Sequence, residues 1–172
     1  MTGHIVIDDV LPSEEFTQIK EAIMHDQFDW QFRKGIKDYK DPACQFVHTF
    51  HIQGMQATTQ ERFSLMYPIL NFIQPAGILR IKANLNQKTA EHYETGLHVD
   101  VMVPVSFTAL FYINTNNGYT YFEDGQKIES IENRMVMFPS NIHHKVYPCK
   151  TKRYVLAGNI NDISYEDKEW VM

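Results

Sequence analysis

The side chains most able to do chemistry in this sequence are a histidine and an aspartate one residue apart, His98 and Asp100. On a β-strand, side chains alternate between faces, so this spacing would place both on the same side. An imidazole nitrogen and a carboxylate oxygen placed that way can share a metal ion. A His-x-Asp pair alone is common, however, and most single histidines are ordinary surface or core groups. The pair therefore predicts a metal site only if a third ligand joins it.

A third ligand is available after a later apolar strand. The stretch Phe138-Pro139-Ser140-Asn141-Ile142-His143-His144 ends in two histidines, either of which could complete the set. Two histidines and one carboxylate on one face of an octahedral ion leave three adjacent positions open. That arrangement is associated with non-haem iron(II) oxygenases.

An arginine follows at a suggestive distance. Arg153 lies nine residues after His144, at the start of a predicted strand over residues 153–160. A guanidinium beside the metal would bind a carboxylate through two charge-assisted hydrogen bonds. The ordinary role of a single arginine is a surface salt bridge. The ordered set of His-x-Asp, distal His and Arg is much harder to obtain by accident.

With these residues in view, the stretch from about 78 to 161 resembles the catalytic core of the 2-oxoglutarate oxygenases, in the prolyl-hydroxylase-like branch. The matching segments are His98-Val99-Asp100, Leu110-Phe111-Tyr112-Ile113-Asn114, Gly118-Tyr119-Thr120, Phe138 to His144, and Arg153. The resemblance implies a double-stranded β-helix, which is a jelly-roll barrel. It also implies Fe(II), 2-oxoglutarate as co-substrate and O2, and it leaves open whether ascorbate is required. The short length resembles compact phage-encoded members, which act in the host cytoplasm.

The resemblance also assigns roles to single residues. The family's distal histidine follows the strand-ending phenylalanine by six positions, which favours His144 over His143. It implies that Tyr112 and Arg153 bind the distal carboxylate of 2-oxoglutarate, although Tyr112 could equally be a core aromatic residue. Asn84, with Arg80 or Lys82 on the same strand face, is a candidate for the metal-proximal carboxylate, although these side chains could equally face solvent.

The implied reaction is hydroxylation of a C–H bond with release of succinate and CO2. Since Asp100 fills the position that is a small residue in halogenating relatives, hydroxylation is favoured over halogenation. The resemblance favours a peptidyl proline or another protein side chain as substrate, and the stretch 87–95 is a candidate lid or merely a connection. Small-molecule substrates remain an alternative.

Other classes fit less well. In this sequence Arg153 is followed by Tyr-Val-Leu-Ala-Gly-Asn, whereas oxygenases of alkylated nucleic-acid bases carry a different pattern after the corresponding arginine. Jumonji-like enzymes use a lysine in place of Arg153. Metal-binding cupins of other classes usually have His-x-His followed by Glu. A non-enzymatic jelly-roll binding module would need neither the ligand set nor Arg153.

The bulk composition is that of an ordinary globular protein. With 172 residues, 44% hydrophobic and 22% charged, we expect one domain over 1–172 with its catalytic core at about 78–161. The net charge of −5 argues against nucleic-acid or membrane-surface partners. Two cysteines form no disulfide framework, and no signal peptide or membrane span is evident, so a cytoplasmic location is expected. The oligomeric state stays open.

Periodicity in the sequence predicts the helices and strands that carry these residues. We predict a strand at 5–10, a helix starting near 11–15 with Ser13 as N-cap, and a second helix over about 59–73. Apolar residues at helical spacing predict the core-facing sides: Phe16, Ile19 and Ile23, with Lys20 on the same stripe, and then Phe63, Met66, Tyr67, Leu70 and Phe72. Strands are predicted at 78–85, 107–114, 119–122, 127–131, 134–138 and 153–160, with an Asp124-Gly125 hairpin turn. Helices followed by many short strands predict a mainly β fold, with helices packed on a jelly roll.

Overall fold

We describe the protein from a computed structural model. The description covers residues 3–34, 44–52, 54–86, 96–100, 103, 106–148 and 157–166, and for 157–166 it covers the backbone only. Arg153 and the stretch 87–95 lie outside the described residues, so the predictions for them stay predictions.

Short antiparallel strands dominate the described chain. In chain order the elements are β1 (Ile5–Ile7), α1 (Ser13–Ile23), β2 (Gln31–Lys34), β3 (Cys44–Ile52), β4 (Met55–Gln56), α2 (Gln60–Ser64), α3 (Tyr67–Ile73), β5 (Arg80–Asn86), β6 (Ser106–Tyr112), β7 (Tyr119–Phe122), β8 (Lys127–Glu129), β9 (Met135–Pro139), β10 (His144–Tyr147) and β11 (Ala157–Glu166).

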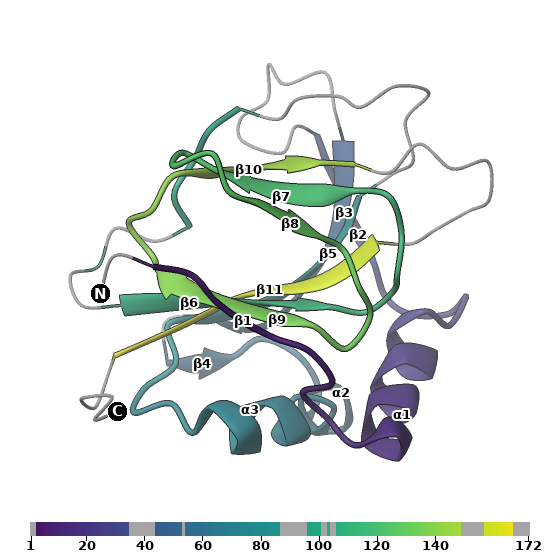
Figure 1. The fold of residues 1–172 in the computed structure, drawn as a ribbon. Helices are drawn as coiled ribbons and strands as arrows, with labels where there is room; N and C mark the ends of the chain where they lie inside the picture. Colours follow the sequence, from purple (N-terminus) through teal and green to yellow (C-terminus); the bar gives the residue numbers. More distant parts are fainter. Residues whose placement is uncertain are drawn as a thin grey trace.

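Two sheets form the body of the molecule. The large sheet has the order β1-β9-β6-β11-β5-β3-β2, with β4 beside β3, and the small sheet has the order β10-β7-β8. Every pairing is antiparallel. The small sheet covers one face of the large sheet and the helices lie against the other (Figure 1). This is a jelly-roll arrangement with flanking helices, so the predicted fold class is confirmed.

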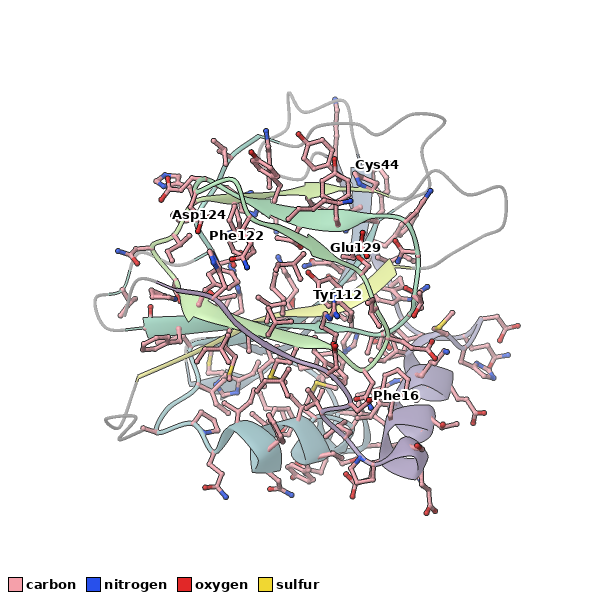
Figure 2. The ribbon with its side chains drawn as sticks, in the orientation of Figure 1. Phe16, Cys44, Tyr112, Phe122, Asp124 and Glu129 are labelled. Carbon is pink, nitrogen blue, oxygen red and sulfur yellow. The ribbon has the colours of Figure 1, made fainter. Side chains whose placement is uncertain are left out.

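Strand β6 separates two apolar layers because its side chains alternate. Ala109 and Phe111 belong to the core between the large sheet and the helices, which also contains Phe16 of α1. Leu110 and Tyr112 belong to the core between the two sheets, together with Phe122 of β7. Figure 2 shows Tyr112 and Phe122 in that inner layer and Phe16 on the helix side. The predicted strand at 107–114 therefore contributes one face to each apolar layer.

Helix α1 presents the predicted stripe, but its start was predicted wrongly. Phe16, Ile19 and Ile23 are buried, whereas Lys20 extends to an ion pair with Glu132 at 2.7 Å. Ser13 is the first helical residue and not the N-cap. Pro12 occupies the cap position, and no side chain caps the helix there.

The helix predicted over 59–73 is two short helices, α2 and α3, because Pro68 falls in the middle. A proline ring clashes with the carbonyl four residues before it and offers no amide hydrogen, so it is tolerated only in a helix's first turn. Helix α3 accordingly begins at Tyr67, with Pro68 in its first turn. The break rotates the apolar face. Tyr67 and Phe72, predicted as core, are 44% and 41% exposed.

The same rotation buries two residues of α3 that the predicted stripe omitted. Ile69 and Ile73 take the buried positions, with 0% and 4% of their surface exposed. The core-facing side of α3 is therefore set by where the helix restarts at the proline.

Strands β2, β3, β4 and β10 were missed by sequence analysis. β3 is a nine-residue strand that pairs with β5 over Gln45–Ile52, and it lies between β5 and the edge strand β2 of the large sheet. The predicted hairpin joins β7 and β8, but of its two central residues only Gly125 has a positive φ, 91°. Among the described residues, no helix has the length and apolar run that crossing a bilayer would require.

Candidate metal centre

Three predicted ligands, His98, Asp100 and His144, converge at one end of the space between the sheets. Their donor atoms all lie within 4.8 Å of one another. His144 Nε2 is 3.4 Å from Asp100 Oδ2, and His98 Nε2 is 3.9 Å from Asp100 Oδ1. Two ligand atoms that each lie about 2.1 Å from one ion are at most about 4.2 Å apart. The separations of both histidines from Asp100 lie within this limit, and two imidazoles and a carboxylate are a donor set that suits a divalent first-row metal.

Backbone pairing holds the two histidines together across the barrel. His98 and His144 form an isolated antiparallel bridge, in which each amide donates to the other's carbonyl at 2.9 Å. β10, which begins at His144, pairs in turn with β7. From the sequence, His98 and Asp100 were expected on a regular strand. The stretch Gly96–Asp100 is not one. The bridge to His144 sets the position of His98 instead.

Both imidazoles present the same nitrogen to the centre. His98 Nδ1 lies 3.1 Å from the carbonyl oxygen of Gly96, and His144 Nδ1 lies 3.3 Å from that of Ile142. A carbonyl can only accept, so Nδ1 carries the proton in each neutral ring and Nε2 keeps its lone pair. This is the tautomer that a metal ligand requires, and the carbonyl also fixes the ring's orientation.

The centre is closed on one side and open on the other. The side chain of His144 is 2% exposed and that of Asp100 is 8% exposed, while that of His98 is 23% exposed. The inner wall is aromatic, since His144 packs against Phe138 and Phe122, with ring centroids 5.1 and 5.8 Å away. Polar ligands inside a partly dry site interact more strongly than in water.

The two adjacent histidines point in different directions. His144 faces Asp100, whereas the side chain of His143 is 52% exposed and lies 3.3 Å from Glu123 Oε2. Strand alternation accounts for this, because neighbouring residues cannot share a face. The geometry therefore agrees with His144, and not His143, as the candidate distal ligand.

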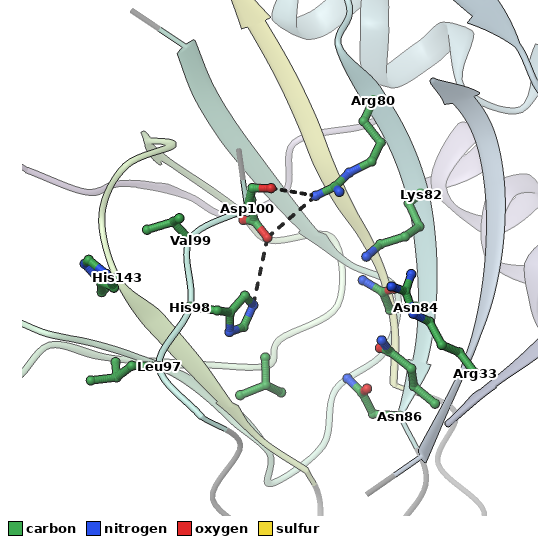
Figure 3. Close-up of a pocket in the computed structure, with 12 residues that line it drawn as sticks. Arg33, Arg80, Lys82, Asn84, Asn86, Leu97, His98, Val99, Asp100 and His143 are labelled. Carbon is green, nitrogen blue, oxygen red and sulfur yellow. Dashed lines mark hydrogen bonds and ion pairs between the residues drawn. The ribbon is translucent and has the colours of Figure 1, made fainter. Parts of the chain in front are cut away.

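Arg80 of β5 contacts the carboxylate ligand, a role that sequence analysis missed. Its Nη2 donates to the backbone carbonyl of Asp100 at 3.2 Å and lies 3.9 Å from Oδ1. Figure 3 shows this arginine reaching across from β5 to the loop that carries Asp100. The only sequence signal was that Arg80 shares a strand face with Lys82 and Asn84, and that alternation indicates a direction but no partner.

Because Arg80 orients Asp100, the Arg80→Gln variant is expected to bind metal about 10- to 100-fold more weakly. Titration of the metal-free protein with Ni(II) by calorimetry measures this. Arg62→Gln is the matched control, since Arg62 pairs with Asp29 and lies over the Phe28 ring, away from Asp100. Equal Ni(II) affinities for the two variants would show that Arg80 does not position the ligand.

A polar cavity of about 440 Å³ opens beside the centre. Its described lining includes three cationic side chains, Arg33, Arg80 and Lys82. It also includes three side-chain amides, from Gln45, Asn84 and Asn86. Arg33, Gln45 and Asn86 are directly opposite one another across β2, β3 and β5, so their side chains share a face of the sheet. The volume is within the usual range for small-ligand sites.

Asn84, predicted as a co-substrate residue, lines this cavity, and Tyr112 is not among its described lining residues. The Tyr112 hydroxyl lies 2.8 Å from Thr120 Oγ1, in the buried layer between the sheets. Burial raises the pKa of Tyr112 to about 12, partly offset by the bond to Thr120. The phenol is therefore neutral at physiological pH, and it can donate one hydrogen bond.

The free energy of unfolding of the Tyr112→Phe variant is expected to be about 1–3 kcal/mol lower than that of wild type at neutral pH, because the buried Thr120 hydroxyl then lacks its partner. The pKa of about 12 lies above the ordinary value of 10, so the phenol's contribution is complete below pH 10. This contribution is lost as pH rises through 12, which lowers the free energy of unfolding of the wild type by up to about 3 kcal/mol. Urea unfolding at pH 7 and from pH 9.5 to 11.5 measures both effects. If the free energies of unfolding of wild type and Tyr112→Phe change with pH in parallel, the expected pH effect of Tyr112 is contradicted.

Comparison with known proteins rests on structure. No profile of a known protein family matches the sequence, and no curated protein matches it by sequence similarity. Among solved structures, a prolyl hydroxylase from Trichoplax adhaerens in complex with a hypoxia inducible factor oxygen degradation domain peptide fragment superposes with a TM-score of 0.68 at 14% identity. The superposition covers 96% of this chain and 84% of the prolyl hydroxylase chain.

Two further structures show the same similarity. A prolyl-4-hydroxylase from Pseudomonas putida gives a TM-score of 0.58 at 12% identity, over 98% of this chain and 95% of that one. HygX from Streptomyces hygroscopicus, with nickel and 2-oxoglutarate bound, gives 0.60 at 11% identity, over 96% and 83%. The fold is therefore that of the 2-oxoglutarate- and iron(II)-dependent oxygenases, over nearly the whole chain.

Proposed function

We propose that this protein is an iron(II)- and 2-oxoglutarate-dependent oxygenase that hydroxylates a C–H bond. The observation that carries the proposal is the convergence of His98, Asp100 and His144, with donor atoms within 4.8 Å, beside an open cavity in a fold of this class. Two imidazoles and one carboxylate would hold iron(II) and leave it able to bind the co-substrate and O2. When bound, iron and 2-oxoglutarate supply the oxidising power, with release of succinate and CO2.

In this proposal each residue of the centre has a separate role. His98, Asp100 and His144 hold the metal, and the carbonyls of Gly96 and Ile142 keep both Nε2 atoms available. Arg80 keeps the Asp100 carboxylate aimed at the centre.

The co-substrate residues are assigned in the same way. Asn84, on the cavity wall, would donate to the metal-proximal carboxylate of 2-oxoglutarate. Arg153 would bind the distal carboxylate, with Tyr112 contributing if its hydroxyl turns from Thr120. Phe122 and Phe138, packed against His144, keep water from the inner side of the centre.

For the substrate we propose a peptidyl proline or another protein side chain. The prolyl-hydroxylase-like motifs of the sequence support this, and so does the fold shared with a prolyl hydroxylase that was solved with a peptide. The centre and its cavity open to solvent beside β2, β3 and β5, where an extended peptide can approach. We propose that the whole chain, 1–172, forms one catalytic domain in the cytoplasm.

The test is anaerobic addition of Fe(II) and 2-oxoglutarate to the metal-free protein, followed by exposure to O2. A charge-transfer absorption band that requires both components is expected, then succinate release that proline peptides increase, with a mass gain of one oxygen in the peptide. If metal binds but 2-oxoglutarate neither produces the band nor yields succinate, the protein is a metal-binding jelly roll of another class. Succinate release that no peptide increases would instead point to a small-molecule substrate.

A further inference from the structure

Three side-chain amides lie on the cavity wall that faces the candidate ligands. Asn84 and Asn86 belong to β5 and Gln45 belongs to β3, and all three line the cavity. They are 5%, 4% and 4% exposed, although asparagine and glutamine are mostly surface residues in proteins. Figure 3 shows Asn84 and Asn86 on the strand wall, across from the loop of His98 and Asp100. This wall can form several hydrogen bonds with a ligand.

The side-chain oxygens of the two asparagines lack a partner in the part of the chain that the structure describes. Oδ1 of Asn84 and Oδ1 of Asn86 are both buried and accept no hydrogen bond there. A buried acceptor without a donor costs free energy, so a bound group that donates to it is favoured. The carboxylates and the keto oxygen of 2-oxoglutarate can only accept hydrogen bonds. Among the ligands of the proposed reaction, only the substrate can therefore supply the donor.

The spacing of the two asparagines matches the repeat of an extended peptide. They are two residues apart on β5, so they share a face at a separation of about 6.6 Å along the strand. In an extended peptide the N–H and C=O of one residue point to the same side, and this repeats at every second residue over the same distance. A carboxamide offers a matching acceptor and donor, and rotation about its Cβ–Cγ bond turns either one toward the cavity. An extended peptide along β5 can therefore pair with both asparagines.

We infer that Asn84 and Asn86 bind the main chain of the peptide substrate at two alternate residues. Each asparagine accepts from the N–H and donates to the C=O of the same peptide residue, and Asn84 keeps a second N–H for the metal-proximal carboxylate of 2-oxoglutarate. Gln45, directly opposite Asn86, continues this polar strip toward β2. In the other direction β5 leads to Arg80, which contacts Asp100, so the target residue lies beyond the Asn84 contact.

The inference rests on the proposed function and adds how the peptide is recognised. Main-chain hydrogen bonds give affinity without selecting side chains. The peptide residues held by the two asparagines can therefore vary, and selectivity comes from the residue at the metal.

The test is peptide binding to protein loaded with Ni(II) and saturating 2-oxoglutarate, measured by calorimetry. The probes are a blocked peptide with a central proline flanked by alanines, and a set of analogues in which one backbone amide at a time is an ester, so that one N–H is lost. The protein variants are Asn86→Leu and Asn86→Ala. Asn71→Ala is the matched control, because Asn71 is an exposed asparagine of α3, and the helices lie against the other face of the large sheet (Figure 1).

Both Asn86 variants are expected to bind the peptide roughly fivefold or more weakly, because each loses the hydrogen bonds of one amide. Their affinity for 2-oxoglutarate should change less than about twofold, and Asn71→Ala should behave as wild type. In wild type, ester replacement should weaken binding at two peptide positions that are two residues apart. At one of these positions it should have no further effect in Asn86→Leu, since the partner amide is already absent.

Thermal unfolding separates a binding role of Asn86 from a structural one. Leucine has a similar size but no acceptor to leave unpaired, so Asn86→Leu should keep or raise the Tm of the protein without peptide. A fall in Tm together with unchanged peptide affinity would assign Asn86 a structural role and overturn the inference.

Other outcomes separate failure of this inference from failure of the proposed function. If the Asn86 variants bind the peptide as wild type does, as expected where only water fills the wall, or if no ester weakens binding, the inference is wrong. Equal losses of 2-oxoglutarate and peptide affinity would assign the amides to the co-substrate and also overturn it. If wild type binds 2-oxoglutarate but no peptide, main-chain recognition is wrong while the oxygenase proposal stands. If wild type binds no 2-oxoglutarate with Ni(II), both proposals fail together.

Discussion

Replacing His144 with alanine is expected to reduce 2-oxoglutarate turnover more than 100-fold. The variant removes one of three candidate protein ligands, a larger change than losing a residue that only orients a ligand, which typically costs 10- to 100-fold. The two remaining donors, on His98 and Asp100, lie on one short segment and would hold an ion weakly. The measurement is succinate release, together with the anaerobic charge-transfer band and the Ni(II) affinity. His144→Gln provides a second variant that fills more of the space between Phe122 and Phe138.

The adjacent histidine is the matched control for this experiment. His143 has the same chemistry one residue earlier, but it is half exposed and faces Glu123. His143→Ala should keep turnover and Ni(II) affinity within about threefold of wild type, since removal of an exposed ion pair has little effect. If His143→Ala loses the band and His144→Ala retains it, the geometry of the centre has been misassigned. Circular dichroism of both variants separates loss of a ligand from loss of fold.

The largest effect on stability is expected for Phe111→Ala, which should lower the free energy of unfolding by about 3–5 kcal/mol. Its side chain has no exposed surface and meets the Phe16 ring edge-on, with centroids 6.0 Å apart. Alanine leaves a cavity where the large sheet packs against α1. For a chain of this length the loss corresponds to a fall in Tm of about 6–20 °C. Thermal unfolding followed by circular dichroism measures it.

A surface phenylalanine shows what the same substitution does without a cavity. Phe32 of β2 is 63% exposed, so Phe32→Ala should cost less than about 1 kcal/mol. Because Phe111 faces the helix layer and not the layer between the sheets, Phe111→Ala should still bind Ni(II) normally below its Tm. Equal Tm shifts for the two variants would mean that Phe111 is not a core residue of the protein in solution.

Local patterns in the sequence were sufficient for several strands, for the first helix and for part of the centre, but not for β2, β3, β4 and β10. The predicted strand at 107–114 is enough to place Phe111 and Tyr112 on different faces, because a strand's side-chain period of two is a property of the backbone itself. The spacing of His98 and Asp100 and the family-like interval to His144 likewise marked the candidate ligands. Pro68 carried the signal that splits the second helix, and reading the apolar stripe alone missed it.

Which of these residues come into contact depends on the tertiary structure. The bridge between His98 and His144 joins segments far apart in the chain, and no local pattern encodes the partner of a strand. The contact of Arg80 with Asp100, and the alignment of Arg33, Gln45 and Asn86 across three strands, depend on sheet register. Register follows from burying one face of every strand at once. It is therefore a property of the assembled sheet, and the row of polar side chains on the cavity wall could be recognised only there.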